Sequence, residues 1–182
     1  MTESAKYVMI SDEQIKSDLS SNNVLFIVGQ CGSGKTKLIN RILRYLDTQS
    51  DCVYLFISHD LSNHTGDSSY GNISATEITN NVLPFIDGGI ENFPETNLAV
   101  STSDVSISQL SDFIFMMAGK CTQNNKTLYV VADDFAHFGD LEDMARRIPS
   151  FKLIVTGVVA EDVEKVRVLS QSLQRNFVTI QL

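Results

Sequence analysis

The chain has 182 residues, of which 43% are hydrophobic and 20% charged, and its formal net charge is −8. This length and composition fit one sizeable hydrophobic core and exclude a disordered chain, so we predict a single domain over residues 1–182. The acidic balance argues against a protein that clamps nucleic acid through a uniformly basic surface. The sequence shows no apolar run as long as a membrane span, which predicts a cytoplasmic protein without a membrane partner.

The first recognisable elements precede a glycine-rich stretch. A short strand is predicted at 7–10, and Ser11 to Gln14 form a capping-box pattern that opens a helix to about residue 19. An apolar run at 24–28 then predicts a strand, and a helical pattern follows from residue 37 to about 46.

A phosphate-loop motif joins that strand to that helix. The motif GQCGSGKT consists of Gly29, Gln30, Cys31, Gly32, Ser33, Gly34, Lys35 and Thr36. It matches the pattern G-x-x-x-x-G-K-[ST] between a strand and a helix, where backbone N–H groups surround a phosphate. Lys35 is then expected to reach the outer phosphates and Thr36 to place its hydroxyl on Mg²⁺. The motif therefore predicts that the chain binds a nucleoside triphosphate.

The rest of the chain alternates strands and helices. Strands are predicted at 52–57, 97–101, 127–132, 151–156 and 176–182, and helices near 75–85, 107–121, 141–147 and 161–173. A polar insertion at about 58–96 is expected to be functional or mobile rather than part of the core. The alternation predicts an α/β fold with a mostly parallel sheet, helices on both faces, and ligands at the carboxyl ends of the strands.

The strand at 127–132 ends in two acids, Asp133 and Asp134. In a phosphate-loop protein this is the Walker B pattern, in which Asp133 holds Mg²⁺ beside Thr36. Asp134 is expected to orient or deprotonate the attacking water. Because another strand lies between the loop and these acids in the sequence, we predict that the acid strand is not the immediate neighbour of the loop strand.

Three further polar residues have two readings each. Thr156 ends the strand at 151–156, where it either senses the γ-phosphate or holds the lytic water, or simply starts the next turn. Arg146 and Arg147 end the helix at 141–147, where they either complement the helix dipole or reach a neighbouring subunit's nucleotide as an arginine finger.

This order of motifs resembles the FtsK/HerA superfamily, and within it the compact genome-packaging ATPases of poxviruses and giant viruses. The resemblance covers residues 24–156 and implies a three-layer, RecA-like additional-strand P-loop fold, ATP and Mg²⁺ as cofactors, and a homo-oligomeric ring. It further implies DNA-stimulated hydrolysis that moves double-stranded DNA into a capsid, with Lys35, Asp134, Thr156 and an arginine in catalytic roles. Many members of the superfamily have Glu where this chain has Asp134. The setting implied is a host cytoplasm or a virion.

Two other functions remain open. A small-molecule or nucleoside kinase suits the chain length, but such enzymes need a lid with arginines, and residues 58–94 contain no Lys or Arg. A nucleotide-switched assembly protein, in which slow hydrolysis controls partner binding, would use the same loop.

Overall fold

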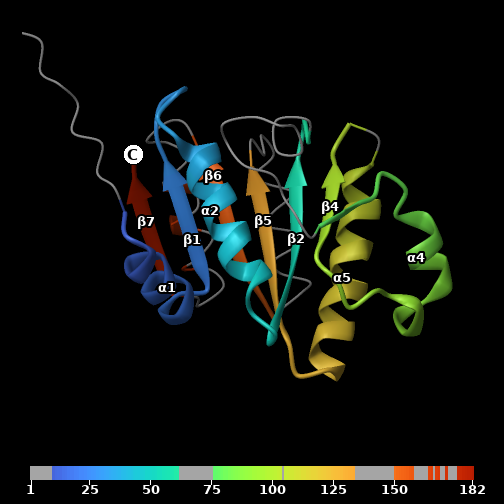
Figure 1. Ribbon diagram of the computed structural model, residues 1–182. Coiled ribbons are helices and arrows are strands. Elements are labelled where there is room, and N and C mark those ends of the chain that lie inside the picture. Colours follow the sequence, from blue (N-terminus) through green and yellow to red (C-terminus); the bar gives the residue numbers. More distant parts are fainter. Residues whose placement is uncertain are drawn as a thin grey trace, which may run out of the picture.

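The computed structural model describes residues 10–61, 76–103, 105–133, 150–157, 164–165, 167–168, 171 and 176–182. A parallel sheet with helices on both sides forms the framework of this part of the chain (Figure 1).

Apart from the segment 76–92, the described helices and strands follow one another in the order that the sequence predicts. The helices are α1 (Asp12–Ser21), α2 (Lys35–Asp47), α4 (Leu83–Gly88), the 3₁₀-helix η1 (Ile90–Asn92) and α5 (Ile107–Gln123). The strands are β1 (Val24–Val28), β2 (Cys52–Ser58), β3 (Glu77–Ile78), β4 (Leu98–Ser101), β5 (Thr127–Asp133), β6 (Phe151–Gly157) and β7 (Phe177–Gln181). Both capping-box patterns mark real helix starts, because Ser11 accepts a hydrogen bond from the Gln14 N–H and Ser106 one from the Gln109 N–H. At Ser106 the box is complete, since the Gln109 side chain accepts from the Ser106 N–H, whereas the Gln14 side chain donates to Asp18.

The sheet has the strand order β3-β4-β2-β5-β6-β1-β7, and every described pair is parallel. The prediction that the acid strand is not next to the loop strand is confirmed, since β6 lies between β5 and β1. The separating strand is not the one that precedes β5 in the sequence, because β4 lies on the far side of β2. The Asp133 strand therefore reaches the loop across one intervening strand.

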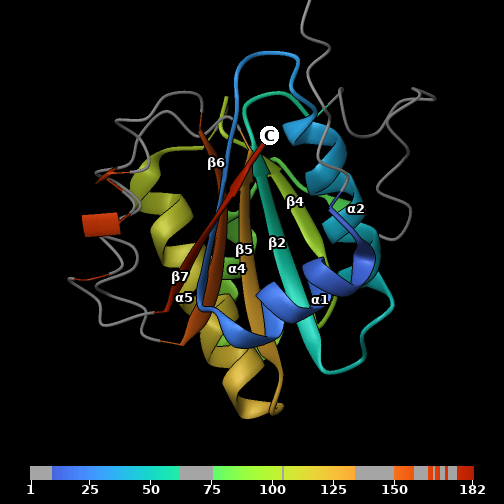
Figure 2. The same cartoon turned by 90° about the vertical axis from the view of Figure 1, so that its left-hand side faces the viewer.

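Two apolar layers bury the sheet. Strands β1 and β2 are buried along their whole length, because successive side chains enter opposite layers. Phe26 packs in the layer that α5 covers, and Ile27 packs in the layer that α1 and α2 cover. Figure 2 shows these two groups of helices on opposite faces of the sheet.

The second half of the 58–96 insertion is anchored to the core by two buried residues, Val82 and Phe93, which corrects part of our expectation for that segment. Phe93 is 3% exposed, and its ring lies 5.1 Å from the Phe113 ring of α5 and 5.9 Å from that of Phe85. Burial of aromatic surface against α5 thus fixes a segment whose polar composition predicted a loop. Residues 62–75 lie outside the described part of the chain.

The helix predicted near 75–85 is wrong. Residues Glu77–Ile78 instead extend the sheet as β3, and the helix α4 begins only at Leu83. Pro84 explains the later start, because its fixed φ suits the first turn of a helix and would break an interior turn.

Several other predicted elements fall partly or wholly outside the described residues. Of the strand predicted at 7–10, only Ile10 is described, and it is not in a strand. The helix predicted at 141–147 is not described, and within 161–173 only five residues are, all of them helical: 164, 165, 167, 168 and 171. None of the helices in the described segments has the length and apolar character that crossing a bilayer requires.

Candidate functional site

The candidate site lies at the carboxyl edge of the sheet, where the loop from Gly29 to Gly34 joins β1 to α2 (Figure 1). Neighbouring strands support the start of the loop. The Gly29 N–H donates to the Gly157 carbonyl at 3.2 Å, and the Leu182 N–H donates to the Val28 carbonyl at 2.9 Å. The loop is thus held between the ends of β6 and β7.

Two glycines allow the loop its shape. Gly34 precedes α2 with a φ of 99°, a left-handed conformation that residues with a Cβ adopt at a cost. At Gly29 the limit is space instead, because a Cβ there would collide with Ser33 Oγ and lie 3.1 Å from the Leu182 carbonyl oxygen. These local requirements explain why the motif carries glycine at both places.

The N-terminus of α2 is open to an anion. Its N-cap residue, Gly34, has no side chain to bond the first N–H groups, and its first turn contains no acidic residue. The partial positive charge of the helix end is therefore not offset by a carboxylate on the helix itself. Such a helix end is suited to a phosphate group.

Lys35 is held over the loop by the loop's own backbone. Its Nζ donates to the Gly29 carbonyl at 2.6 Å and to the Gln30 carbonyl at 3.0 Å, and the residue is only 8% exposed. An ammonium has three donors, so a third proton remains for a ligand. The arrangement places a nearly buried positive charge where the motif predicts the outer phosphates.

Asp133 joins two hydroxyl groups from different elements. Thr36 Oγ1 donates to Asp133 Oδ2 at 3.2 Å, and Thr156 Oγ1 donates to Asp133 Oδ1 at 2.7 Å. Both Asp133 and Thr156 are almost fully buried, at 2% and 3% exposed. The structure thus brings together three of the residues that the sequence singled out, from α2, β5 and β6.

The pair Thr36 and Asp133 fits a magnesium ion. Mg²⁺ prefers oxygen ligands and is usually held by one or two protein groups together with phosphates and water. Thr36 offers a hydroxyl oxygen and Asp133 a carboxylate oxygen within 3.2 Å of each other. Within the described segments no cluster of three or more His, Cys, Asp and Glu could hold a metal alone, so this pair depends on phosphate oxygens to complete the ligand set.

Thr156 shows a role that sequence reasoning did not assign. It was predicted to sense the γ-phosphate or hold the lytic water, or to start a turn, and in the structure its hydroxyl donates to the Asp133 carboxylate. Ser33 was predicted as a member of the loop, but not that its Oγ is buried with no hydrogen-bond partner in the described structure. No sequence signal could have found either feature, because both depend on where β6 and the loop lie relative to their neighbours.

Three predicted site residues, Asp134, Arg146 and Arg147, lie outside the described part of the chain. Their roles remain predictions. The other loop residues, including Gln30, Cys31 and Gly32, lie in the loop itself, and Cys31 is exposed.

The parallel sheet, the loop and the Thr36–Asp133 pair define the fold of a P-loop NTPase. The chain belongs to the family described as Nephrocystin 3, N-terminal, whose model matches residues 8–146. A comparison with curated proteins found no match.

A solved structure shares this fold. It is described as the genome packaging NTPase B204 from Sulfolobus turreted icosahedral virus 2, in complex with ATP-gammaS. The TM-score is 0.50 and the identity 11%, and the match covers 77% of this chain and 66% of that chain. At this identity the likeness bears on the fold alone. Of the resemblance drawn from the sequence, the P-loop NTPase class is confirmed.

Proposed function

We propose that this protein is a Mg²⁺-dependent ATPase of the FtsK/HerA type that works as a motor on double-stranded DNA, packaging a viral genome into a capsid. The observation that carries the proposal is the pair of hydrogen bonds from Thr36 and Thr156 to the two oxygens of Asp133, beneath the phosphate loop. This arrangement fits a site for a nucleoside triphosphate and its metal. The packaging role rests on the sequence resemblance and on the shared fold of the viral packaging NTPase.

The chain's own residues have distinct tasks in this proposal. The loop N–H groups and Lys35 bind the phosphates, and the ammonium stays over the loop through the Gly29 and Gln30 carbonyls. Thr36 and Asp133 hold the metal, and Thr36 can do so while its proton points to Asp133. When bound, Mg²⁺ would neutralise charge that develops on the phosphates.

Residues outside the described part complete the proposal. Asp134 directly follows Asp133 in the chain and would orient or deprotonate the attacking water. Arg146 or Arg147 would stabilise the transferring phosphoryl group in the site of the next subunit of a homo-oligomeric ring. A capsid protein is a further proposed partner.

The test is phosphate release by the purified protein with and without Mg²⁺ and double-stranded DNA. We expect hydrolysis that requires Mg²⁺ and accelerates with DNA. Lys35→Ala should abolish nucleotide binding, whereas the matched control Lys37→Ala removes a neighbouring exposed lysine of the same helix and should retain it. If neither DNA nor RNA changes the rate of ATP hydrolysis and no oligomer forms with nucleotide, the proposed motor function is wrong.

One substitution of the acid pair and one transfer assay separate the competing functions. In a motor, Asp134→Asn should keep ATP affinity and lose turnover, whereas a nucleotide-switched assembly protein would keep its partner binding in the ATP state. Transfer of phosphate to an acceptor faster than to water would instead identify a kinase. The absence of Lys and Arg from residues 58–94 argues against the kinase.

A further inference from the structure

Positive and negative residues are unevenly divided along the chain. Residues 45–119 contain ten Asp and Glu and no Lys or Arg, whereas the rest of the chain contains 12 acidic and 14 basic residues. The net charge of −8 therefore arises in this middle segment. Of its described elements, which also include β2 and most of α5, the four elements β3, α4, η1 and β4 lie together at one side of the molecule (Figure 1).

The surface of that side combines acids with exposed apolar side chains. We call it the acidic edge and define it by Glu77, Ile78, Leu83, Asp87 and Glu91. All five are exposed, and Ile78 and Leu83 are 45% exposed. They are two of the four large hydrophobic residues that are exposed in the described part of the chain. Two exposed apolar side chains beside three carboxylates give this edge both apolar and negatively charged contact area.

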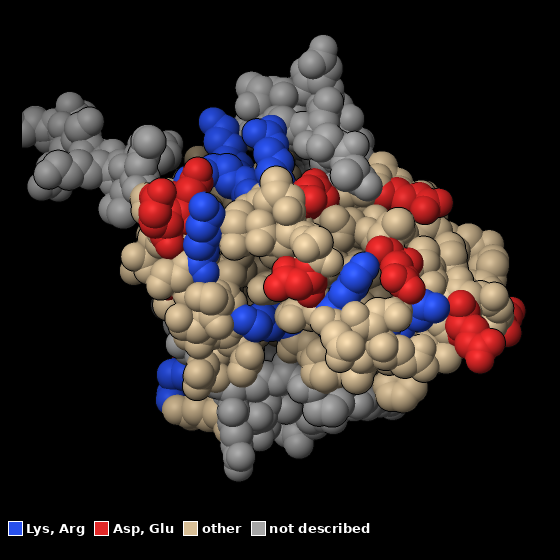
Figure 3. Space-filling model, turned by 60° about the horizontal axis from the view of Figure 1, so that its bottom comes forward, with Lys and Arg blue, Asp and Glu red and all other residues tan. Residues whose placement is uncertain are grey.

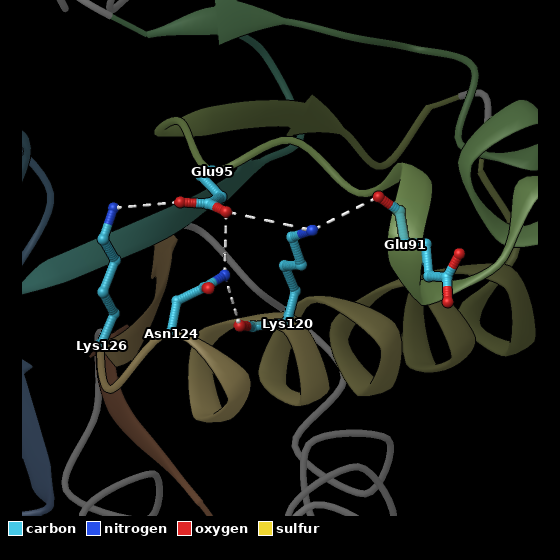
Figure 4. A network of polar contacts seen from close by, with 5 residues as sticks. All are labelled: Glu91, Glu95, Lys120, Asn124 and Lys126. Atoms are coloured by element: carbon cyan, nitrogen blue, oxygen red, sulfur yellow. Dashed lines mark hydrogen bonds and ion pairs between the residues drawn. The ribbon is translucent and has the colours of Figure 1, made fainter.

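Nearby lysines do not neutralise this edge. Lys120 and Lys126 both pair with Glu95, at 3.9 and 3.7 Å, and Lys120 reaches only the backbone carbonyl of Glu91. Figure 4 shows the Glu91 carboxylate turned away from Lys120. In the described part of the chain, no Lys or Arg forms an ion pair with the carboxylates of the acidic edge.

A cleft of opposite charge lies between α1 and α2. We call it the α1–α2 cleft; its volume is about 320 Å³, and its lining includes Asp12, Ile15, Lys16, Arg41, Arg44 and Tyr45. Asp12 is paired with Arg41 at 2.6 Å, and Lys16 lies over the Tyr45 ring at 5.6 Å. Three cations against one acid leave the lining positive. Tyr45 gives the surface of the cleft an apolar part, whereas Ile15 is only 2% exposed and belongs to the core.

The two surfaces lie far apart on the molecule. The helices α1 and α2 cover one face of the sheet, and α1 lies at the β1–β7 side. The helix α4 packs on α5 over the other face, beyond β4 (Figures 1 and 2). On the face shown in Figure 3, a red group forms the right-hand extremity, and the blue groups at the upper left lie beside a second red group. One copy therefore cannot bring its own two surfaces together.

We propose that the acidic edge of one copy of this chain docks into the α1–α2 cleft of the next copy. The charges are complementary, and the exposed Leu83 supplies an apolar side chain that can pack on the Tyr45 ring of the cleft. A contact between two different surfaces is head-to-tail, and it closes into a ring where the rotation allows. This inference names the surfaces through which neighbouring copies would contact one another. The role of that contact in a motor rests on the proposed function.

The observations favour a second copy over nucleic acid as the occupant of the cleft. Nucleic acid would use the cations of the cleft, but it would leave the apolar, acidic edge without a partner. A second copy accounts for both surfaces at once, since the acidic edge of each copy complements the α1–α2 cleft of its neighbour.

Reversing the charges of each surface in a separate variant, and then mixing the two variants, tests the contact. Variant one is Lys16→Glu with Arg44→Glu, which leaves the Arg41–Asp12 pair intact; variant two is Asp87→Lys with Glu91→Lys. Sedimentation velocity of the full chain with Mg·ATP at about 50 mM salt should show self-association that weakens about tenfold or more in each variant alone and at high salt. An equimolar mixture of the two variants should associate again, because each carries the surface that the other lost.

The matched control Asp51→Lys with Asp112→Lys has the same charge change at exposed sites outside the acidic edge, and it should associate as the wild type does. The inference is overturned if the wild type stays monomeric, if either variant associates like the wild type, if the mixture fails to associate, or if the control also loses association. A cleft variant that loses DNA binding but not self-association would identify nucleic acid as the occupant and likewise overturn it.

Nucleotide binding separates this inference from the proposed function. Both variants should bind a fluorescent ATP analogue in the same way as the wild type, because neither touches the phosphate loop. If the assembled wild type hydrolyses no ATP, the proposed function fails and the contact stands. If the wild type hydrolyses ATP but does not self-associate, the contact fails and the ATPase stands.

Discussion

Thr156 Oγ1 donates a 2.7 Å hydrogen bond to Asp133 Oδ1, although the two residues are 23 positions apart in the sequence. The bond fixes one carboxylate oxygen, and Thr36 contacts the other at 3.2 Å. Asp133 therefore cannot turn without losing a buried hydrogen bond. Its orientation toward the loop depends on a residue of the neighbouring strand.

Removing the Thr156 hydroxyl should weaken metal binding more than it disturbs the fold. A hydrogen bond to a charged group contributes about 1.5–3 kcal/mol, which corresponds to about a tenfold to hundredfold effect. We expect Thr156→Val to raise the Mg²⁺ concentration needed for half-maximal hydrolysis by that factor, with nucleotide binding in EDTA unchanged. Thr156→Ser keeps the hydroxyl and should restore the wild-type value. Equal Mg²⁺ dependence of the valine and serine variants would contradict this role.

Asp133→Asn should remove metal binding without lowering the thermal stability of the metal-free protein. The carboxylate is 2% exposed, and burial of a charge is costly unless its partners compensate. We expect the metal-free variant to unfold at the same temperature as the wild type or higher. Mg·ATP at about 100 times its Kd should stabilise the wild type by about 2.7 kcal/mol and the variant much less. Differential scanning calorimetry with and without Mg²⁺ measures both, and equal stabilisation of the two proteins would contradict the assignment.

Cys31 should report nucleotide binding without any need for hydrolysis. It is exposed in the phosphate loop, whereas Cys52 and Cys121 are buried, and burial raises the pKa of each of these two thiols to about 11. The thiolate is the reactive form, so at about pH 8 the two buried cysteines should react slowly. We expect mass spectrometry to find rapid alkylation at Cys31 alone and its suppression by Mg·ATP. Cys31→Ser is the control, and alkylation at Cys31 that ATP leaves unchanged would contradict the loop assignment.

Lys152 should contribute to stability through the end of α1. Its Nζ donates to the carbonyls of Leu19 and Ser20 and lies 5.7 Å from the centre of the Tyr129 ring, and its burial lowers the pKa of the ammonium. We expect Lys152→Met to lower the free energy of unfolding by about 1–3 kcal/mol, because the carbonyls lose a charged donor.

The matched control for this prediction is Lys126→Met. Lys126 forms a partly exposed ion pair with Glu95 at 3.7 Å, and such pairs contribute about 0–1 kcal/mol. Urea denaturation of both variants measures the difference. An equal loss in the two variants would show that Lys152 is no more than another surface cation.

The sequence predicted the central elements well because their signals are local. Apolar runs marked β1, β2, β5 and β6, and capping boxes at Ser11 and Ser106 marked the starts of α1 and α5. The helix predicted from the sequence at 75–85 was wrong, because Glu77–Ile78 pair with β4 and the helix α4 starts only at Leu83. The pairing of an edge strand depends on a partner far away in the chain, so a local pattern could not reveal it.

The sequence by itself determined the phosphate loop, since glycine at Gly29 and Gly34 and the residues Lys35 and Thr36 are required by local backbone geometry and by phosphate chemistry. Only the tertiary structure decided what surrounds Asp133. The parallel register pairs Ala132 with Val155, which brings the next residues, Asp133 and Thr156, side by side. The structure also decided that an acidic segment and a basic cleft lie on different sides of the molecule. Both relationships arise from strand order and helix packing, which bring together residues that are distant in the chain.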